Sequence, residues 1–545
     1  MLGLMQDWPL LCQRIIEHGA REHGDRRVVT REPGGTLRIT NYREMYDNAR
    51  RISKKLIEEG IVKGDRIGTL GWSTARHAEC WYGISGIGAV YHPINARLFS
   101  EQILHVINHA EDRILFVDPC FLSLVEPLAP QISSIEKYIV MCDEADMPPT
   151  TLPGAISMER WLDGVEAADF EWGTFDENTA ATLTYTSGTT GNPKGVLYSH
   201  RSVVLMSMAA ITPDMYSFSA RDVVLQIVPM YHANAWTWPF SGPMTGASLV
   251  FPGHQMDGAS ITDLLIDERI TLTGGVPTIW QTVLECLAAR GLRLQHLRRV
   301  FVGGAACTKP VVDALTAQGV EVRPAYGMTE MGPLGAVATV RAENEGVQGE
   351  ERTRLMQSQG RPPFMVETRS VDEDGRVQPR DGKSVGHLQV RGPCILRSYF
   401  RSESHSLTED GYLDTGDIAS IDELGYLHLT DRAKDLVKSG GEWISSIDME
   451  HAAMSHPGVH EAAVIGAKHP KWDERPLLFV VPRPEAQLTR DGLYAHLEGR
   501  MAKWWLPDDI LFVPELPHTA TGKLNKVALR QKYGNYLVEQ SPDAE

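Results

Sequence analysis

Residues 180–198 carry the feature that most limits how this chain can fold. An apolar, β-prone run at 180–185 leads into a segment rich in hydroxyl side chains and glycines, and a second apolar run follows at 196–198. The segment between them reads Thr186-Ser187-Gly188-Thr189-Thr190-Gly191-Asn192-Pro193-Lys194-Gly195. Glycines let the backbone approach a polyanion, hydroxyl and amide groups donate to phosphate oxygens, and a lysine adds a positive charge. The pattern predicts a phosphate-binding loop between two strands.

Two other interpretations of this glycine-rich segment, a common P-loop and a flexible linker, fit the sequence less well. In the common P-loop the lysine is followed directly by Ser or Thr, whereas Lys194 is followed by Gly195. A flexible Ser/Gly linker would lack the apolar strand on each side and the Pro-Lys-Gly ending.

The composition is that of a large globular protein. The chain has 545 residues, 42% of them hydrophobic and 23% charged, which is enough for more than one core. A formal net charge of −17 argues against nonspecific nucleic-acid binding. The cysteines are scattered without close pairs, which favours reduced thiols over disulfides or a zinc site. Because we find no signal peptide and no apolar run long enough to span a bilayer, we expect a cytoplasmic protein without membrane insertion.

Helical and strand patterns alternate over most of the chain, which favours an α/β fold. We expect a helix at 42–59, a buried helix at 80–90 and strands at 67–70, 115–118, 138–141, 299–302 and 388–392. The polar segment 341–359 is expected to be an exposed loop. Beyond Asp431, a short polar passage with glycines precedes a helix at 446–454, strands at 461–465 and 477–481, and a helix at 489–502. This change predicts a separate C-terminal α+β domain.

Five further segments combine polar and aromatic residues in ways that suit chemistry. Each is weak alone: aromatic residues around a histidine are often core, a turn with two carboxylates is often solvated, and a single lysine is usually a surface charge. The segments are Pro229-Met230-Tyr231-His232-Ala233-Asn234-Ala235-Trp236, Tyr326-Gly327-Met328-Thr329-Glu330, Asp414-Thr415-Gly416-Asp417, the run from Asp431 to Trp443, and the run from Leu516 to Lys526 that contains Gly522-Lys523.

In this order, the segments resemble the adenylate-forming superfamily of acyl-CoA synthetases, nonribosomal adenylation domains and luciferases. The resemblance implies a large, multi-sheet α/β N-terminal domain at residues 1–431, a hinge at 432–434 and a small, mobile α+β lid domain at 435–545. It also implies two half-reactions, adenylation of a carboxylate by ATP and then thioester formation with CoA.

The resemblance assigns the residues of the first half-reaction. Phosphoryl chemistry of this kind depends on positioning and charge neutralisation, and an oxygen-only site suits Mg²⁺. The residues implied to bind the phosphates are Thr186, Ser187, Gly188, Thr189, Thr190, Gly191 and Lys194; those implied at the adenine, α-phosphate and ribose are Gly304, Ala305, Tyr326, Gly327, Thr329, Asp417 and Arg432. Thr186 and Glu330 are implied to position Mg²⁺, and Lys523 to stabilise the charge that develops during adenylation.

For the second half-reaction the resemblance implies a rotation of the lid. The rotation is implied to occur at Lys434, two residues after Arg432, and to exchange Lys523 for another face of the lid. Lys438, Gly440 and Trp443 are the cofactor-binding residues implied in this region. We also expect a homodimer.

The identity of the acid depends on the acyl pocket, for which we expect His232, Trp236, Gly303 and Gly327. His232 is also expected among the catalytic residues, with Lys523 and Lys434. Relatives that activate amino acids have an Asp where this chain has His232, so an α-amino acid is disfavoured. Segments 94–99 and 107–113 look similar to medium-chain fatty acyl-CoA ligases, and most of all to the 3-methylmercaptopropionyl-CoA ligases of dimethylsulfoniopropionate breakdown. We therefore expect a small unbranched acid, with 3-methylmercaptopropionate favoured and a general short- or medium-chain fatty acid as the alternative.

Other classes of function remain open at this point. A luciferase-like oxygenase would use the same first step. A nonribosomal module would need a carrier domain, which we do not find after Lys526. A non-catalytic nucleotide sensor should have lost Lys523 or Glu330, and both are present.

Overall fold

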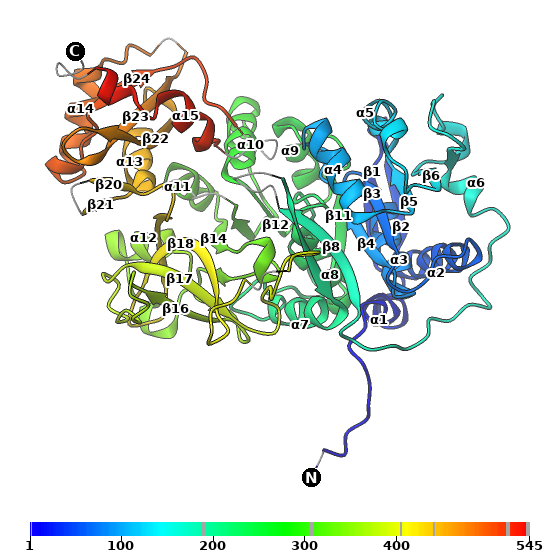
Figure 1. Cartoon of the computed structure of the whole chain (residues 1–545). Coiled ribbons are helices and arrows are strands. Elements are labelled where there is room, and N and C mark those ends of the chain that lie inside the picture. The colour runs from blue at the N-terminus through cyan, green and yellow to red at the C-terminus, as the bar shows by residue number, and fades with distance from the viewer. Residues whose placement is uncertain are drawn as a thin grey trace. The chain divides into compact units, whose positions relative to one another are not determined.

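The structure of the protein is a computed structural model of the chain, and most of its helices and strands are labelled in Figure 1. It describes residues 1, 3–186, 192–304, 309–403, 406–439, 442–484, 486–518 and 524–540, with the backbone alone at 350, 353, 442 and 443. The chain divides into two compact units. Unit 1 comprises Met1–Glu367 and Arg391–Leu413, and unit 2 comprises Thr368–Val390 and Asp414–Glu545.

The first sheet of unit 1 is almost entirely parallel. Among the described residues it has eight strands in the order β15-β14-β13-β12-β10-β11-β1-β2, and only the outermost strands β15 and β2 run antiparallel to their neighbours. Its strands are β15 (Ala336–Val337), β14 (Glu321–Tyr326), β13 (Arg299–Val302), β12 (Leu272–Gly275), β10 (Val223–Leu225), β11 (Ser248–Phe251), β1 (Arg27–Arg31) and β2 (Leu37–Asn41). The central strands are apolar on both faces, as is usual for parallel strands covered by helices.

Helices cover this sheet and complete its core. The side chains of Trp280, Val283 and Leu287 are buried with Val300 and Val302 in one hydrophobic cluster. The helices that pack on the sheet include α8 (Trp238–Thr245), α9 (Gly258–Asp267), α10 (Pro277–Arg290) and α11 (Lys309–Ala317). Helix α1 (Gln13–His23) packs against α8, and α7 (His200–Ala210) contacts both α8 and the strands β8 and β9 of the second sheet.

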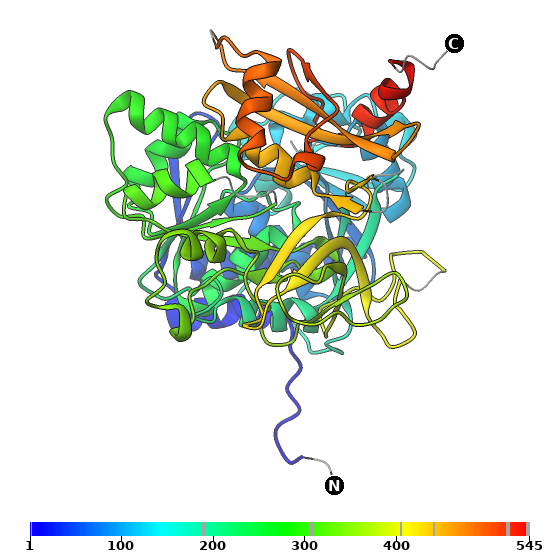
Figure 2. The ribbon, with the colours of Figure 1, turned by 90° about the vertical axis from the view of Figure 1, so that its left-hand side faces the viewer.

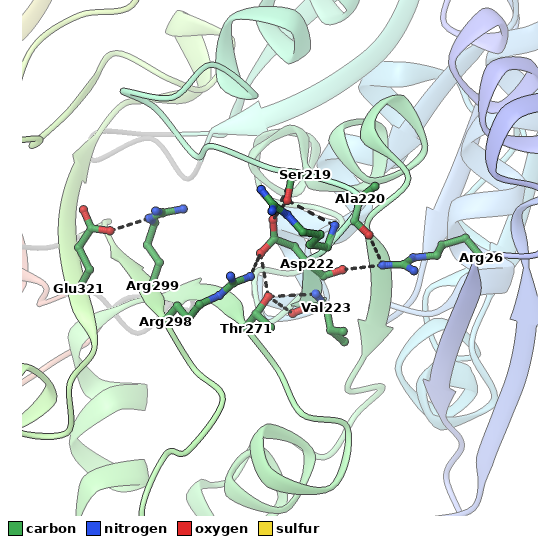
Figure 3. Close-up of polar contacts among 10 residues, drawn as sticks. Arg26, Ser219, Ala220, Asp222, Val223, Thr271, Arg298, Arg299 and Glu321 are labelled. Carbon is green, nitrogen blue, oxygen red and sulfur yellow. Dashed lines mark hydrogen bonds and ion pairs between the residues drawn. The ribbon is translucent and has the colours of Figure 1, made fainter.

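The amino-terminal edge of this sheet is closed by polar contacts, as Figure 3 shows. Asp222, buried just before β10, accepts hydrogen bonds from the Ser219 hydroxyl at 2.7 Å, the Thr271 hydroxyl at 2.9 Å and Arg298 at 2.8 Å. Thr271 and Arg298 directly precede β12 and β13. Asp222 therefore ties together the starts of three parallel strands, and the opposite edge holds the loops that follow these strands.

The second sheet of unit 1 has seven strands among the described residues, in the order β7-β6-β5-β3-β4-β8-β9. All neighbours are parallel except the β8–β9 pair, which is an antiparallel hairpin. The strands are β7 (Ile156–Ser157), β6 (Lys137–Val140), β5 (Ile114–Val117), β3 (Arg66–Leu70), β4 (Val90–Pro93), β8 (Ala180–Thr186) and β9 (Lys194–Ser199). Helices α2 (Tyr42–Glu58), α3 (Ala75–Gly86) and α4 (Ser100–Ala110) belong to this half of the unit.

The described part of unit 2 contains two smaller sheets. Four strands pair in the order β16-β17-β18-β19, with bounds Glu367–Val371, Gly386–Arg391, Leu413–Ile421 and Leu427–Arg432. The other sheet has the path β21-β20-β23-β22, and β24 pairs with β23. Its strands are β20 (Val437–Ser439), β21 (Glu442–Ile444), β22 (Val459–His469), β23 (Asp473–Pro482) and β24 (Asp509–Phe512).

Alternating residues of β23 fill two cores, one on each face of the second sheet. Leu478 and Val480 pack with helices α13 (Ser446–Met454) and α14 (Arg490–Glu498). Leu477 and Phe479 pack on the other face with α15 (Lys526–Tyr533) and α16 (Tyr536–Glu539). The period of two is that of a strand covered on both sides, and Figure 2 shows this part of the chain in orange and red.

The structure confirms the predicted α/β class and most of the predicted elements, with corrections. The helix expected at 80–90 starts earlier, at Ala75, because the Thr74 side chain caps it by accepting from the His77 backbone N–H. The segment 341–359 is not wholly a loop, since α12 (Gly349–Gln357) forms within it. Its Glu, Arg, Leu, Met and Gln residues favour helix even though their charge suggests a loop.

No helix among the described residues is long and apolar enough to cross a membrane.

Candidate active site

Several predicted site residues lie at the carboxyl ends of parallel strands in the eight-stranded sheet. Gly303 and Gly304 follow β13, Tyr326 ends β14, and Gly327 comes next. Because parallel strands end at the same edge, these loops meet there, where ligands bind in open α/β sheets. His232 and Trp236 lie in the segment that follows β10, a third strand of the same sheet.

The predicted phosphate loop connects β8 and β9. Thr186 is the last residue of β8 and pairs with Lys194, the first residue of β9. Leu183 and Val196 are buried, so the hairpin is rooted in the core while the exposed Lys194 lies at its open end. The predicted phosphate-binding residues 187–191 lie outside the described residues.

Lys194 is connected to Glu330 through an aromatic ring. The Lys194 ammonium lies 4.9 Å from the centroid of the Tyr399 ring, and the Tyr399 hydroxyl donates to Glu330 Oε1 at 2.9 Å. Burial, and then the Glu330 carboxylate, raise the pKa of Tyr399, so its phenol keeps the proton and remains a donor. Tyr399 was not predicted, because a single tyrosine in a loop is part of no motif.

The segment that contains Tyr399 also makes backbone hydrogen bonds to Glu330 and to the hairpin. The Leu396 N–H donates to the Glu330 carbonyl at 2.8 Å, and the Phe400 N–H donates to the Gly195 carbonyl at 2.8 Å. We call residues 396–401 the strap. The Tyr198 hydroxyl of β9 also donates to the Thr329 carbonyl. The hairpin, the strap and the turn that carries Glu330 therefore form one connected structure.

The turn after β14 is too crowded for any side chain at Gly327. A Cβ there would lie 1.8 Å from the Pro333 carbonyl oxygen, and the Gly335 N–H donates to the Tyr326 carbonyl at 2.9 Å. The turn leads into the 3-10 helix η5 (Thr329–Met331), in which Glu330 is 7% exposed. Because η5 lies against β8, the turn brings the predicted metal ligand Glu330 to the strand that ends in Thr186.

The donor set at this place fits Mg²⁺. Glu330 offers a carboxylate and Thr186 a hydroxyl, and Mg²⁺ prefers oxygen ligands while taking most of them from water and substrate phosphates. Among the described residues, no cluster of three or more His, Cys, Asp or Glu residues could hold a metal by itself. A metal bound here would thus depend on the nucleotide for part of its coordination.

The predicted acyl wall has an unusual backbone. All five residues of the turn η4 (Ala233–Thr237) have positive φ, from 39° at Ala233 to 70° at Thr237, and none is glycine. A left-handed residue other than glycine costs roughly 1–2 kcal/mol. The buried Gln226 amide donates to the carbonyls of Val228 at 2.7 Å and Ala235 at 3.3 Å, which helps to hold the turn.

The turn brings Trp236 against Gly303. A Cβ on Gly303 would lie 3.1 Å from Trp236 Cη2 and 2.9 Å from the Ala325 carbonyl, so the glycine leaves room for the indole ring. His232 precedes the turn and its ring lies 5.0 Å from that of Tyr231. The structure thus brings Trp236 and Gly303 together. Gly303 follows β13, and Gly327 follows the adjacent strand β14.

In unit 2 the predicted ribose-binding residues are neighbours. Asp417 on β18 pairs in register with Arg432 on β19, and their side chains approach to 3.4 Å between Oδ1 and Nε. The Asp417 side chain is 10% exposed and that of Arg432 48%. Lys434, the predicted hinge, lies in the turn between β19 and β20.

The remaining predicted cofactor residues are only partly described. Lys438 on β20 pairs in register with Trp443 on β21, and its backbone N–H donates to Glu474 at 3.1 Å. Ala305, Gly440 and Lys523 lie outside the described residues.

Comparison with known proteins identifies the family. The family of AMP-binding enzymes matches residues 16–400, and the AMP-binding enzyme C-terminal domain matches residues 448–523. The chain belongs to the AMP-binding enzyme family. This membership confirms the predicted resemblance to the adenylate-forming enzymes.

Relatives match over almost the whole chain. A 3-methylmercaptopropionyl-CoA ligase of Ruegeria lacuscaerulensis is 45% identical, over 98% of this chain and 100% of its own length. A medium-chain-fatty-acid–CoA ligase of Ectopseudomonas oleovorans is 43% identical over 99% of each chain. The crystal structure of ATP-bound MatB from Rhodopseudomonas palustris matches with a TM-score of 0.80 at 26% identity, over 96% of this chain and 99% of that one. These similarities confirm the predicted fold, and the relatives place the chain among the acyl-CoA synthetases of the family.

Proposed function

We propose that this protein is an acid–thiol ligase that converts a carboxylic acid, ATP and CoA to acyl-CoA, AMP and pyrophosphate through an acyl-adenylate. The observation that carries the proposal is the connection of the Lys194 hairpin to the buried Glu330 through Tyr399. It joins a phosphate-binding cation to a metal-binding carboxylate in a chain that is 45% identical to a CoA ligase.

The first half-reaction requires the acid carboxylate to attack the α-phosphorus of ATP in line with the leaving pyrophosphate. The hairpin from Thr186 to Lys194 holds the β- and γ-phosphates. Glu330 and Thr186 are the residues that would hold Mg²⁺, and the ion would supply charge neutralisation of the phosphates. The carboxylate is already ionised at neutral pH, so no strong general base is needed. Thr329, next to Glu330, contacts the α-phosphate, and Lys523 stabilises the charge that develops there.

The nucleoside is assigned to two groups of residues, one for the adenine and one for the ribose. Tyr326 and Gly304, with Gly327 beside them, bind the adenine from the ends of β14 and β13. Asp417 accepts from the ribose hydroxyls, and Arg432 supports it from the adjacent strand. The Arg432 guanidinium fixes the orientation of the Asp417 carboxylate, which suits a bidentate contact with two hydroxyls.

The second half-reaction requires CoA to reach the adenylate carbonyl. The domain at 1–431 and the lid at 435–545 are joined by the hinge at 432–434, and the lid rotates about Lys434. The position suits a hinge because hinges are short segments at the ends of elements, and Lys434 lies in the turn between two strands. The rotation withdraws Lys523 and presents another face of the lid, which carries Lys438, Gly440 and Trp443. This face receives CoA.

For the acid we favour 3-methylmercaptopropionate, with butyrate to octanoate also accepted. Two relatives support this range by their names, one a 3-methylmercaptopropionyl-CoA ligase and one a medium-chain-fatty-acid–CoA ligase. A thioether sulfur is close to a methylene in size and is polarisable, so a slot walled by Trp236 suits either acid. A general short- or medium-chain ligase is the alternative. We also propose a cytoplasmic homodimer, since the cysteines among the described residues are unpaired, which fits a reducing compartment, and two-fold dimers are the commonest oligomers.

A pyrophosphate-release assay over acids of three to sixteen carbons, with and without CoA, tests this function. We expect AMP and pyrophosphate as products, and ADP with phosphate would overturn the proposal. Trp236→Ala should change the chain-length profile, while a wild-type optimum at fourteen carbons or more would reject the small-acid substrate.

The division between half-reactions is tested with Lys523→Ala. Adenylation should lose roughly 3–4 kcal/mol of transition-state stabilisation, the value of one preorganised charge, whereas thioester formation from supplied acyl-adenylate should be largely spared. Lys503→Ala, an exposed lysine elsewhere in unit 2, is the control. Equal losses in both half-reactions would contradict the separate use of the two lid faces.

A further inference from the structure

We propose that the carboxyl-terminal end of α4 positions the phosphate-binding hairpin, with His109 and Glu111 as positioning residues for ATP. The inference rests on the proposed role of the hairpin. It concerns residues 109–112, His109-Ala110-Glu111-Asp112, which lie in a segment that the sequence singles out and to which the mechanism gives no part.

The first contact reaches the strand that enters the phosphate loop. His109 Nδ1 and the Tyr185 hydroxyl are hydrogen-bonded at 2.7 Å. Tyr185 directly precedes Thr186 and pairs in register with Gly195 on the far side of the loop. Burial, and then the charges of His105 and Arg401, hold the pKa of His109 below its ordinary value. The neutral ring therefore fixes the root of the loop without placing a charge there.

The second contact reaches the strap. Glu111 accepts two hydrogen bonds from the Arg401 guanidinium, at 2.9 and 2.6 Å. The Phe400 ring packs edge-on against the His109 ring, with centroids 5.5 Å apart, and the Phe400 N–H bonds to Gly195. The strap also carries Tyr399, which contacts Lys194 and Glu330. The end of α4 thus holds both strands of the hairpin, one directly and one through the strap.

The backbone is left-handed at both residues of the Glu111–Arg401 pair. Glu111 follows the last turn of α4 with φ 55°, and Arg401 has φ 57°. Glycine is the usual residue at such a left-handed helix end, and both conformations are unfavourable for residues with side chains. Both side chains are exposed, and exposed ion pairs add little to stability. A strained ion pair that adds little stability is expected where the side chains are needed for positioning.

Behind Tyr185 lies a rigid support. His92 Nδ1 and Asp112 Oδ2 are 2.8 Å apart, and both side chains are completely buried. The His92 ring lies 5.0 Å from that of Tyr185. Tyr185 therefore packs against the His92 ring, which Asp112 holds, and is hydrogen-bonded to His109 at its hydroxyl, so two residues of the 109–112 segment contribute to its position.

The test uses two substitutions, each of which removes one contact, to separate positioning of the hairpin from stability of the fold. Tyr185→Phe keeps the ring and removes the hydroxyl. Glu111→Gly removes the carboxylate and supplies the residue that the left-handed backbone prefers. We expect each variant to raise the KM for ATP roughly 3- to 10-fold, the factor that one ordinary hydrogen bond is worth, while the KM for the acid changes less than twofold. The melting temperature of Glu111→Gly should equal or exceed that of the wild type.

Further variants test the coupling and provide a control. His109→Asn, which keeps a hydrogen-bonding group near the position of Nδ1, should recover part of the KM for ATP that His109→Ala loses. Tyr185→Phe combined with His109→Ala should be no worse than the more damaging single change, because both remove one contact. Glu101→Ala, at the exposed start of α4, is the control.

Two different failures can be distinguished. A melting temperature of Glu111→Gly below the wild-type value, together with an unchanged KM for ATP, would show that the 109–112 segment is structural and would overturn the inference. If the wild type released no pyrophosphate with any acid of the panel, the proposed function itself would fail. An active wild type with ATP-insensitive variants would overturn only the positioning role.

Discussion

The hydroxyl of Tyr399 offers a sharp test of how the hairpin and the Glu330 turn cooperate. Tyr399→Phe removes the donor that lies 2.9 Å from Glu330 Oε1 and keeps the aromatic ring beside Lys194. A hydrogen bond to a charged group contributes about 1.5–3 kcal/mol, and Glu330 is only 7% exposed, so water cannot readily replace the donor. Since about 1.4 kcal/mol corresponds to a factor of ten, kcat/KM for ATP should fall roughly 10- to 150-fold.

Tyr399→Leu separates the two contacts of the ring. It removes the hydroxyl and also the aromatic face that lies 4.9 Å from the Lys194 ammonium. A cation–π contact at an exposed site contributes about 0.5–1 kcal/mol. The kcat/KM for ATP of the leucine variant should therefore be lower than that of the phenylalanine variant by a further factor of roughly two to five. The difference between the two variants measures how much the ring alone holds Lys194.

The assay is pyrophosphate release with ATP varied at saturating Mg²⁺, and then with Mg²⁺ varied at fixed ATP. Because the lost donor bonds to the proposed metal ligand, the Mg²⁺ requirement of Tyr399→Phe should rise along with the KM for ATP. Tyr412→Phe is a matched control, since it removes a tyrosine hydroxyl that bonds to the exposed Glu367 at 3.2 Å. A Tyr399→Phe enzyme with wild-type kinetics for both ATP and Mg²⁺ would refute the reasoning, and equal phenylalanine and leucine variants would show that Lys194 does not use the ring.

Three other perturbations test separate parts of the structure. Lys434→Pro fixes φ in the proposed hinge, so thioester formation should slow more than adenylation; wild-type rates in both half-reactions would place the rotation elsewhere. Gly327→Ala puts a Cβ 1.8 Å from the Pro333 carbonyl oxygen. The variant should therefore lose at least about 1–3 kcal/mol of unfolding free energy, melt at a lower temperature than the wild type and bind ATP poorly. A wild-type melting temperature together with a wild-type KM for ATP would contradict this. Burial raises the pKa of Glu79 from 4.5 to about 7, so the folded protein holds this proton more tightly than the unfolded chain, and stability falls as the pH rises through that window. Glu79→Gln should therefore be more stable than the wild type at pH 8, by up to about 3 kcal/mol, with a gap in melting temperature that narrows toward pH 5; a gap independent of pH would contradict the assigned cause.

The parts of the site that are local in sequence could be predicted. Thr186 and Lys194 pair as predicted from a glycine-rich loop between two apolar runs, because such a loop and its flanking strands are encoded by neighbouring residues. The turn after Tyr326 could also be predicted, since glycine is the only residue type that fits at position 327 beside Pro333. In each case the chemistry of the motif and the preference of the backbone agree.

The parts that depend on distant contacts could not be predicted. Tyr399 meets Lys194 and Glu330 only after the strap has folded back onto the hairpin, and no pattern near Tyr399 reports those partners. The same holds for the partners of His109, because Tyr185 is 76 residues away in sequence. Helix α12 was missed for a different reason, since its charged residues suggested a loop although they are good helix formers.

The left-handed backbone positions around the site have a common physical explanation. Glu111, Arg401 and the whole turn from Ala233 to Thr237 have positive φ without glycine. Local preferences would place glycine at such positions, and glycine would remove the Arg401 partner at 111 and the indole that packs on Gly303 at 236. The surrounding contacts must therefore maintain conformations that the local sequence disfavours, as is expected where a side chain is required for function. For this reason the observed backbone departs from the local conformational preference of the sequence at the edges of the site, while the strands behind it follow their apolar pattern.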